Sequence, residues 1–277
     1  MARSELRKLL HRASEVGVRA VLAASVDRAD WDYLPHLLGE NRVQIFISFG
    51  LHPYFVNEVT LDLCREHLEE LQLRVESAGA GPESGLESGM VAIGECGLDF
   101  LRAKDSDARA RQVEVFRAHL ELARATGLPL TIHCVKAHGP LLELLRERAT
   151  PPAAMHAFSG SAEVASQLVD AGHYISFAAN VCIPNARRSV EAAQAIPRER
   201  LLIETDSPDQ TPPARRPAAN EPAFIVDVVA RLAELRGVEA SALAEQTAIN
   251  ACRLFDVELD ALAELDTTAF DGRERGE

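Results

Sequence analysis

The chain has 277 residues, which fits one large α/β domain with a sizeable buried core. It carries 29 Lys and Arg against 42 Asp and Glu, a formal net charge of −13, so its surface repels polyanions and excludes a non-specific grip on long nucleic acid. Five scattered cysteines without a CxxC pair exclude a disulfide framework and favour a reducing compartment. No stretch resembles a signal peptide or is long enough to span a bilayer, so we expect a cytoplasmic protein without a membrane partner.

Short apolar runs alternate with amphipathic segments along the chain, and the runs are typical of strands buried on both faces. In chain order we predict a helix at 6–16, a strand at 18–24, a helix at 29–40, a strand at 43–49 and a helix at 60–75. A surface loop at 77–89, a strand at 91–95 and a long helix at 107–126 follow. Strands at 128–132, 153–155, 174–179 and 201–205 then alternate with helices at 140–148, 161–171 and 187–195, before a polar loop at 208–220 and helices at 223–236 and 240–254.

This alternation predicts right-handed crossovers and a parallel sheet. Polar residues stand where several strands end, and catalytic groups of (β/α)8 barrels lie at that rim. No G-x-G-x-x-G fingerprint follows the first strand, which argues against a dinucleotide-binding open sheet. We therefore predict a (β/α)8 TIM-type barrel as a single domain at residues 1–260, followed by an acidic tail at 261–277.

Four predicted strands run into a side chain that can bind a metal ion. These side chains are Glu95, His133, His156 and Asp206. A single histidine at the end of a strand is more often a core or capping residue, and a lone acid there is often a solvated loop residue. Four such endings of these types instead predict a carboxylate-bridged divalent metal site.

Five motifs, taken in order along the chain, resemble those of the TatD family of metal-dependent deoxyribonucleases, relatives of the amidohydrolase barrels. The motifs are Gly50-Leu51-His52-Pro53, Ile93-Gly94-Glu95-Cys96-Gly97-Leu98-Asp99, Ile132-His133-Cys134, His156-Ala157-Phe158-Ser159-Gly160 and Leu202-Ile203-Glu204-Thr205-Asp206-Ser207-Pro208. The resemblance covers nearly the whole chain.

The resemblance implies a cofactor of divalent metal ions, Mg²⁺, Mn²⁺ or Zn²⁺, with up to two per chain. Glu95 would bridge both ions and His133 and His156 would complete the second. Asp206 would hold the first ion together with the attacking water, from which it can accept a proton as the general base. The resemblance thus makes Glu95 and Asp206 the catalytic pair.

Further residues are candidates for contact with the substrate. His52 lies at the end of its own strand, where it either contacts the scissile phosphate or caps a helix. Lys136 stands where family members often carry Arg. It would bind a phosphate through a single ammonium group, whereas an arginine binds through the paired N–H groups of its guanidinium. Asp99 either fixes a ligand or the loop at 208–220, or it is a surface acid.

One part of the family pattern is absent, the Asp-x-His-x-His motif of the first barrel strand. Met1 aligns within the family's first helix, so we expect the chain to start after that strand. Either the true start lies upstream, or the barrel has a gap whose neighbouring strands keep unpaired edges. In the second case the first metal position loses two imidazoles, and we expect one tightly held ion with the other weak or empty.

The leading hypothesis for function is a phosphodiesterase that hydrolyses DNA by a metal-activated water. DNA or a short oligonucleotide would be its substrate, without a stable nucleic-acid partner. A metal-dependent hydrolase of a small ester or amide is the alternative, since fold does not fix function and the surface is acidic. A third hypothesis is a catalytically impaired barrel, because the ligands of the first strand are missing.

Overall fold

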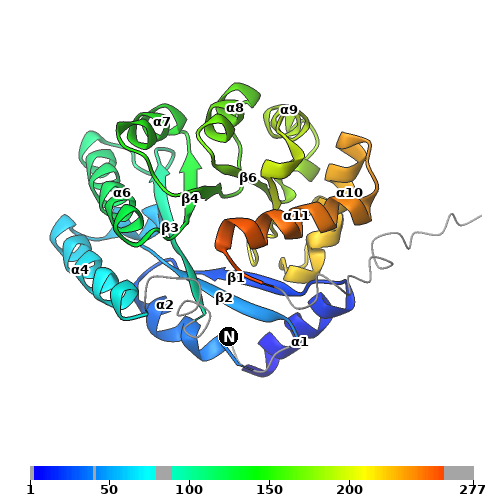
Figure 1. The fold of residues 1–277 in the computed structure, drawn as a ribbon, viewed down its shortest axis with the longest axis horizontal. Coiled ribbons are helices and arrows are strands. Elements are labelled where there is room, and N and C mark those ends of the chain that lie inside the picture. Colours follow the sequence, from blue (N-terminus) through cyan, green and yellow to red (C-terminus); the bar gives the residue numbers. More distant parts are fainter. Residues whose placement is uncertain (1–2, 40–41, 79–88, 259–277) are drawn as a thin grey trace, which may run out of the picture.

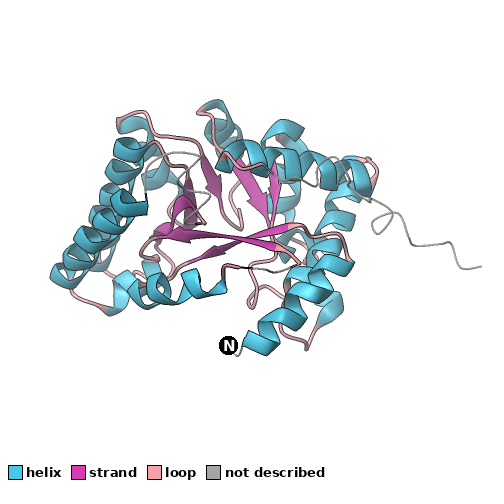
Figure 2. Ribbon diagram, turned by 60° about the horizontal axis from the view of Figure 1, so that its bottom comes forward, coloured by secondary structure: helices cyan, strands magenta, loops and turns pink. Residues whose placement is uncertain are grey.

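The computed structural model describes residues 3–39, 42–78 and 89–258 of the chain. These residues form one curled sheet with helices around its outer face (Figures 1 and 2). The acidic tail predicted at 261–277 lies outside the described residues, as does most of the loop predicted at 77–89. None of the described helices combines the length and hydropathy that a bilayer-spanning helix needs.

The sheet has seven described strands, all parallel, and each pairs with its neighbour in chain order. They are β1 (Ala20–Ala24), β2 (Gln44–Phe49), β3 (Met90–Asp99), β4 (Leu130–Val135), β5 (Ala153–Met155), β6 (Tyr174–Phe177) and β7 (Leu201–Ile203). Parallel strands need a crossover between each pair, and helical segments provide the crossovers. The structure confirms the predicted TIM-type α/β barrel with one strand fewer than eight.

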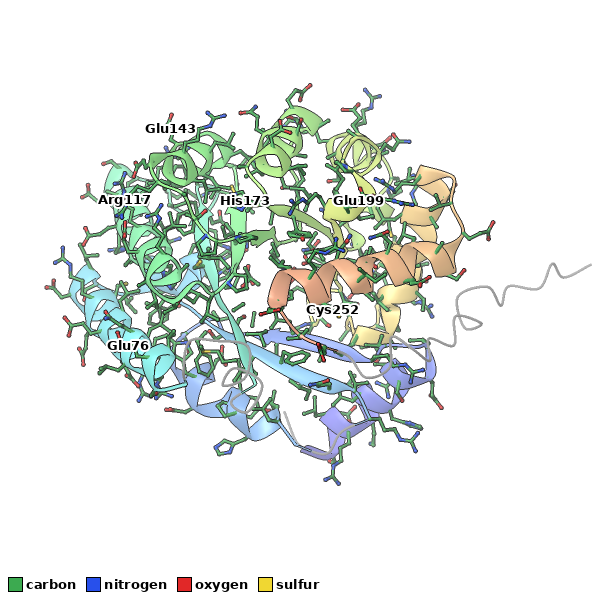
Figure 3. All side chains as sticks on the ribbon, in the orientation of Figure 1. Glu76, Arg117, Glu143, His173, Glu199 and Cys252 are labelled. Carbon is green, nitrogen blue, oxygen red and sulfur yellow. The ribbon has the colours of Figure 1, made fainter. Side chains whose placement is uncertain are left out.

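Helices cover the outer face of the sheet, and their charged side chains, such as Glu76, Arg117 and Glu143, point away from it (Figure 3). The helices are α1 (Arg3–Glu15), α2 (Arg28–Tyr33), α3 (Pro53–Glu58), α4 (Leu61–Ala78), α6 (Ser106–Thr126), α7 (His138–Glu147), α8 (Ala162–Asp170), α9 (Arg187–Ala195), α10 (Ile225–Arg236) and α11 (Ala240–Phe255). Short 3-10 turns lie at Leu34–Leu37, Ala179–Cys182, Arg198–Arg200, Pro213–Arg215 and Pro222–Phe224.

The structure differs from the elements predicted from the sequence at three places. The helix predicted at 29–40 ends at Tyr33, because Pro35 lacks the N–H that a continuing α-helix needs, and a 3-10 turn follows. The short helix α3 was not predicted. Strand β3 does not end at Glu95 but runs on to Asp99, so Glu95 lies within the strand.

The apolar interior of the sheet includes the end of α11. Leu254 and Phe255 pack with side chains of β5, β6 and β7, namely Ala154, Tyr174 and Leu202. Phe255 also belongs to a second cluster, with Ala20, Leu22, Phe46, Val91, Cys252 and Val257, that reaches β1, β2 and β3. The C-terminal end of α11 therefore connects the two ends of the sheet.

Strands β1 and β7 are the two edges of the sheet. Within the described residues no ladder joins them: β1 pairs with β2 and β7 pairs with β6. The described sheet thus has a gap between β1 and β7, and Phe255 of α11 packs against both sides of it.

Candidate metal centre

Glu95 reaches the interior because β3 passes unusually close to β4. The register of the two strands shifts between Ile93 and Cys96, and Gly97 pairs with His133. A Cβ at Gly94, where φ is +140°, would lie 2.5 Å from the carbonyl oxygen of Thr131. A Cβ at Gly97, where φ is +135°, would collide with the His133 carbonyl. The two glycines that flank Glu95 are therefore required by this close approach.

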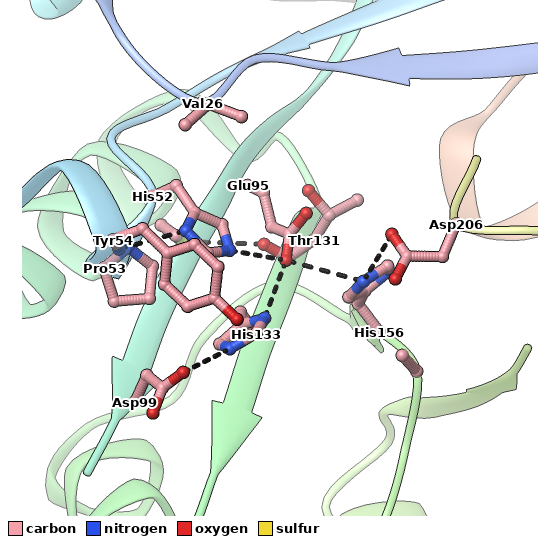
Figure 4. A network of polar contacts seen from close by, with 12 residues as sticks. Val26, His52, Pro53, Tyr54, Glu95, Asp99, Thr131, His133, His156 and Asp206 are labelled. Atoms are coloured by element: carbon pink, nitrogen blue, oxygen red, sulfur yellow. Dashed lines mark hydrogen bonds and ion pairs between the residues drawn. The ribbon is translucent and has the colours of Figure 1, made fainter. Parts of the chain in front are cut away.

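Three imidazoles surround one oxygen of the Glu95 carboxylate (Figure 4). From Glu95 Oε1 it is 3.1 Å to His133 Nδ1, 3.3 Å to His52 Nε2 and 3.6 Å to His156 Nε2. The imidazoles come from β4, from the start of α3 and from the end of β5. Donor atoms of His52, Glu95 and His133 all lie within 4.8 Å of one another.

His133 and His156 each hold a second carboxylate on the far side of the ring. His133 Nε2 lies 3.4 Å from Asp99 Oδ2, and His156 Nδ1 lies 2.9 Å from Glu204 Oε1. A carboxylate on the far nitrogen keeps a proton there, so that a metal ion at the near nitrogen has to displace only the proton that faces Glu95. The tautomers of His133 and His156 therefore suit metal ligation.

His52 has the opposite arrangement. Its Nδ1 accepts a hydrogen bond of 3.0 Å from the backbone N–H of Tyr54 and so caps α3. A neutral imidazole that accepts at Nδ1 carries its proton on Nε2, the atom that faces Glu95. Geometric proximity places His52 in the group of possible metal ligands, but its tautomer makes it a hydrogen-bond donor. His52 therefore caps a helix, as one of its sequence alternatives predicts, while its contact with a scissile phosphate stays a prediction.

The carboxylates behind the imidazoles of His133 and His156 are themselves fixed. Asp99 Oδ1 accepts hydrogen bonds of 2.9 Å from the backbone N–H groups of Leu101 and Arg102. Glu204 accepts from the Ala157 N–H and from the Ser176 hydroxyl, each at 2.6 Å. Each imidazole is thus oriented by an acid that the backbone or another strand holds in place.

Asp206 completes the group from the loop after β7. Its Oδ1 lies 3.3 Å from His156 Nε2, and its Oδ2 accepts a hydrogen bond from the side chain of Gln210. Asp206 has a φ of +59°, a left-handed conformation that is uncommon outside glycine and often marks functional sites. The buried Asn220 donates 2.6 Å hydrogen bonds to the carbonyls of Thr205 and Asp209 and so fixes the backbone on both sides.

The site attracts positive charge. Burial alone raises the pKa of Glu95, but the charge of His156 and hydrogen bonds from His133 and His52 outweigh it and hold the pKa well below its usual range. Burial lowers the pKa of His156, yet the charges of Glu204 and Glu95, with Asp206, raise it well above the ordinary value. The protons on these imidazoles occupy the place that a metal cation would take, and metal binding displaces such protons.

The donor set fits one divalent ion. Glu95, His133 and His156 supply one carboxylate and two correctly protonated imidazoles, and Asp206 adds a second carboxylate. Such mixed nitrogen and oxygen sets suit Zn²⁺ or Mn²⁺, with Mg²⁺ less well served. Among the described residues, the only other imidazole that faces Glu95 is His52, whose near nitrogen is protonated. A second ion would find carboxylates but no further imidazole.

The structure brings Glu95, His133, His156, Asp206 and His52 together, but not Lys136. That lysine is exposed just after β4, with a φ of +56°, and forms no ion pair within the described residues. The sequence analysis assigns no role to Glu204. Its position at a strand end, two residues before Asp206, is the one sequence feature that indicates a place in the site. Asp99 contacts His133, as one of its sequence alternatives proposed.

Known proteins resemble this chain over nearly its whole length. The family described as TatD related DNase matches residues 2–256. The metal-dependent hydrolase YcfH of Escherichia coli strain K12 is 33% identical over 256 residues, 92% of this chain and 89% of that protein. The 3'-5' ssDNA/RNA exonuclease TatD of Erwinia tasmaniensis is 33% identical over 262 residues, 90% of this chain and 93% of that protein. A crystal structure of YjjV, a TatD homolog from Escherichia coli K12, superposes with a TM-score of 0.81 at 27% identity and covers 92% of this chain and 93% of that one. The chain therefore belongs to the TatD-related DNase family.

Proposed function

We propose that the protein is a metal-dependent phosphodiesterase that hydrolyses DNA, with short single strands as its substrates. Family membership gives the coarser activity, metal-dependent hydrolysis, and a relative is named as an exonuclease of single-stranded DNA and RNA. The observation that carries the proposal is the convergence on Glu95 of two imidazoles, each backed by its own carboxylate. Such backing is characteristic of histidines that bind metal ions.

Glu95, His133, His156 and Asp206 are the residues that would hold the divalent ion. A divalent ion in such a site lowers the pKa of water and offsets the negative charge that develops on a phosphate in hydrolysis. Asp206 can accept the proton of the attacking water, because its Oδ1 faces the site while Gln210 fixes its Oδ2. Asp99 and Glu204 keep the two imidazoles in the required tautomer.

His52 serves the substrate rather than the ion. Its Nε2–H points into the site and can donate a hydrogen bond to a non-bridging oxygen of the scissile phosphate. Such a donor stabilises the added charge of the transition state, provided that its position is fixed before the reaction. The backbone N–H of Tyr54 fixes it. Lys136 stays a proposed contact for a more distant phosphate, because it is exposed just after β4 and lacks an acidic partner in the described chain.

A second candidate function is hydrolysis of an ester or amide in a small metabolite. The net charge of −13 favours it, because an acidic surface slows the approach of a polyanion. The same residues would act on either substrate. We also propose a cytoplasmic location, since all five cysteines are free thiols in the structure.

Incubation of the protein with a short end-labelled single strand of DNA tests the proposal. We expect shortened products with Mg²⁺, Mn²⁺ or Zn²⁺, none with a chelator, and none from Glu95→Gln protein with any ion. Glu199→Gln is the matched control, because Glu199 is exposed in the turn before β7 and should leave the rate unchanged. Protein that cleaves carboxylic esters but no DNA would favour the second candidate and reject the first.

A further inference from the structure

An arginine and a tyrosine form a stacked pair beside the metal centre. The guanidinium carbon of Arg102 lies 3.8 Å from the centre of the Tyr54 ring. The same ring meets His52 edge-to-face, with centroids 4.4 Å apart, and His133 with centroids 5.6 Å apart. Figure 4 shows Tyr54 next to both histidines. A single aromatic ring therefore separates Arg102 from the histidine that faces the scissile position.

The backbone around Arg102 is held by the same acid that orients His133. Asp99 Oδ1 accepts 2.9 Å hydrogen bonds from the N–H groups of Leu101 and Arg102, while its other oxygen faces His133. Asp99 is almost wholly buried, so this anchor is firm. The position of Arg102 relative to the metal centre is thus fixed from both ends, by its backbone and by the ring that its guanidinium covers.

Arg102 is exposed and makes no ion pair within the described chain. Acidic residues outnumber basic ones by 42 to 29, and Arg12, Arg28 and Arg74 each hold a carboxylate, whereas the guanidinium of Arg102 is held by an aromatic ring. A guanidinium that is preorganised on a ring but has no carboxylate keeps its donors available for an external anion.

We propose that Arg102, held against Tyr54, binds the phosphate adjacent to the scissile phosphate of a nucleic-acid strand. The inference rests on the proposed function and adds a second phosphate subsite to it. Neighbouring phosphates are one nucleotide apart, and Arg102 is one side chain away from His52. The fork of the guanidinium can bind two non-bridging oxygens at once, which a lysine cannot. A local cation also explains how an acidic protein could hold a short polyanion.

Two substrates separate this subsite from the metal centre. A short single-stranded oligonucleotide carries neighbouring phosphates, whereas the p-nitrophenyl ester of thymidine 5'-monophosphate carries only the reacting one. We expect Arg102→Ala to lower kcat/KM on the oligonucleotide about tenfold more than on the ester, mainly through KM, as befits a charged hydrogen bond. The slope of log kcat/KM against log salt should become shallower by about 0.7 on the oligonucleotide, the value for one phosphate contact to a single strand.

Matched variants exclude effects of charge and folding. Arg198→Ala removes the same charge from a side chain that is 74% exposed. Arg198 precedes β7, whereas Arg102 follows β3, so the two lie at opposite ends of the parallel strands and Arg198→Ala should change neither rate. Arg102→Lys keeps the charge but loses the fork and should fall between wild type and Arg102→Ala. Tyr54→Leu removes the ring that holds Arg102 and should lose oligonucleotide cleavage as Arg102→Ala does.

Equal losses on both substrates, or none on either, would overturn the subsite. An unchanged salt slope in Arg102→Ala would overturn the phosphate contact even if the rate fell. Wild-type protein that cleaves the ester but no oligonucleotide would instead contradict the proposed function, and the subsite with it. The two failures are distinguishable because the first is read from the variants and the second from wild-type protein alone.

Discussion

At the scale of single residues, the role of each imidazole in the site depends on the group that contacts its far nitrogen, the ring nitrogen that faces away from Glu95. His133 and His156 face carboxylates there, whereas His52 faces the N–H of Tyr54. Three histidines at similar distances from Glu95 therefore divide into two candidate metal ligands and one hydrogen-bond donor. Distance alone would have made all three ligands.

The first prediction tests this division. His133→Asn should lose tight metal binding, because it removes an imidazole that Asp99 orients toward Glu95. His52→Asn should keep the metal affinity within a few-fold and still lose turnover, and its amide oxygen can continue to cap α3. Isothermal titration with Zn²⁺ or Mn²⁺, alongside the nuclease assay, checks both. If His52→Asn lost the metal as fully as His133→Asn, the tautomer assignment would be wrong.

The second prediction concerns Glu204, which holds His156 from behind. Glu204→Gln keeps the shape and a hydrogen-bonding oxygen but removes the charge that fixes the imidazole proton. We expect metal affinity or activity to fall by about 10- to 100-fold, the usual effect of such partners. The exposed Glu234→Gln on α10 serves as its control. Unchanged metal affinity and rate in Glu204→Gln would show that Ser176 and the Ala157 N–H orient His156 without that charge.

At the scale of elements, a buried histidine of α6 connects that helix to the segment that carries His52. His119 Nε2 accepts a 3.0 Å hydrogen bond from the N–H of Leu51, and its Nδ1 lies 2.8 Å from the Val115 carbonyl. His119 must therefore be neutral, with its proton on Nδ1. Burial lowers its pKa from 6.5 to about 4 despite the bond to Val115.

The third prediction is a pH dependence of stability. Between pH 6.5 and about 4 the unfolded chain binds a proton at His119 that the folded chain excludes, so the free energy of unfolding falls as the pH falls through that window. The loss approaches about 3 kcal/mol and stops below the folded pKa, where both states are protonated. His119→Gln should flatten this part of the curve, measured by urea denaturation, whereas the exposed His11→Gln should not. Equal slopes in wild type and His119→Gln would reject the neutral, buried assignment.

The elements show what the sequence could and could not predict. Apolar runs that end in Glu95, His133, His156 or Asp206 predicted both the strands and the direction of the site, because period and composition are local properties. The shift of register between β3 and β4 was not predictable, since it depends on the approach of Thr131 to Gly94. Contacts of Glu204 and of Arg102 also depend on tertiary placement, and no local pattern specifies them.

At the scale of the whole molecule, apolar packing rather than a ladder of hydrogen bonds connects the two edges of the curled sheet. Strands β1 and β7 have no common ladder in the described chain, and the end of α11 packs against both sides of the gap. Apolar burial is non-directional, so a helix end can replace a strand in the core without matching its hydrogen bonds. The helix supplies packing, while the metal centre lies at the other end of the strands.

The fourth prediction follows from this closure. Leu254 is 5% exposed and packs on Tyr174 and Leu202, so Leu254→Ala should lower the free energy of unfolding by about 2–5 kcal/mol. The exposed Val238→Ala in the turn before α11 should change it by less than about 0.5 kcal/mol. Urea denaturation of both variants provides the measurement. A loss below about 1 kcal/mol in Leu254→Ala would mean that α11 does not support the edge of the sheet at β7.

The metal content of the purified protein tests the central claim most directly. Glu95, His133, His156 and Asp206 supply the donors for one ion, and the remaining imidazole, His52, is protonated toward the site. Elemental analysis after exhaustive dialysis should therefore find about one tightly held divalent ion per wild-type chain and none in Glu95→Gln, by ligand count. Two tightly held ions, or a content that Glu95→Gln leaves unchanged, would contradict this assignment of the site.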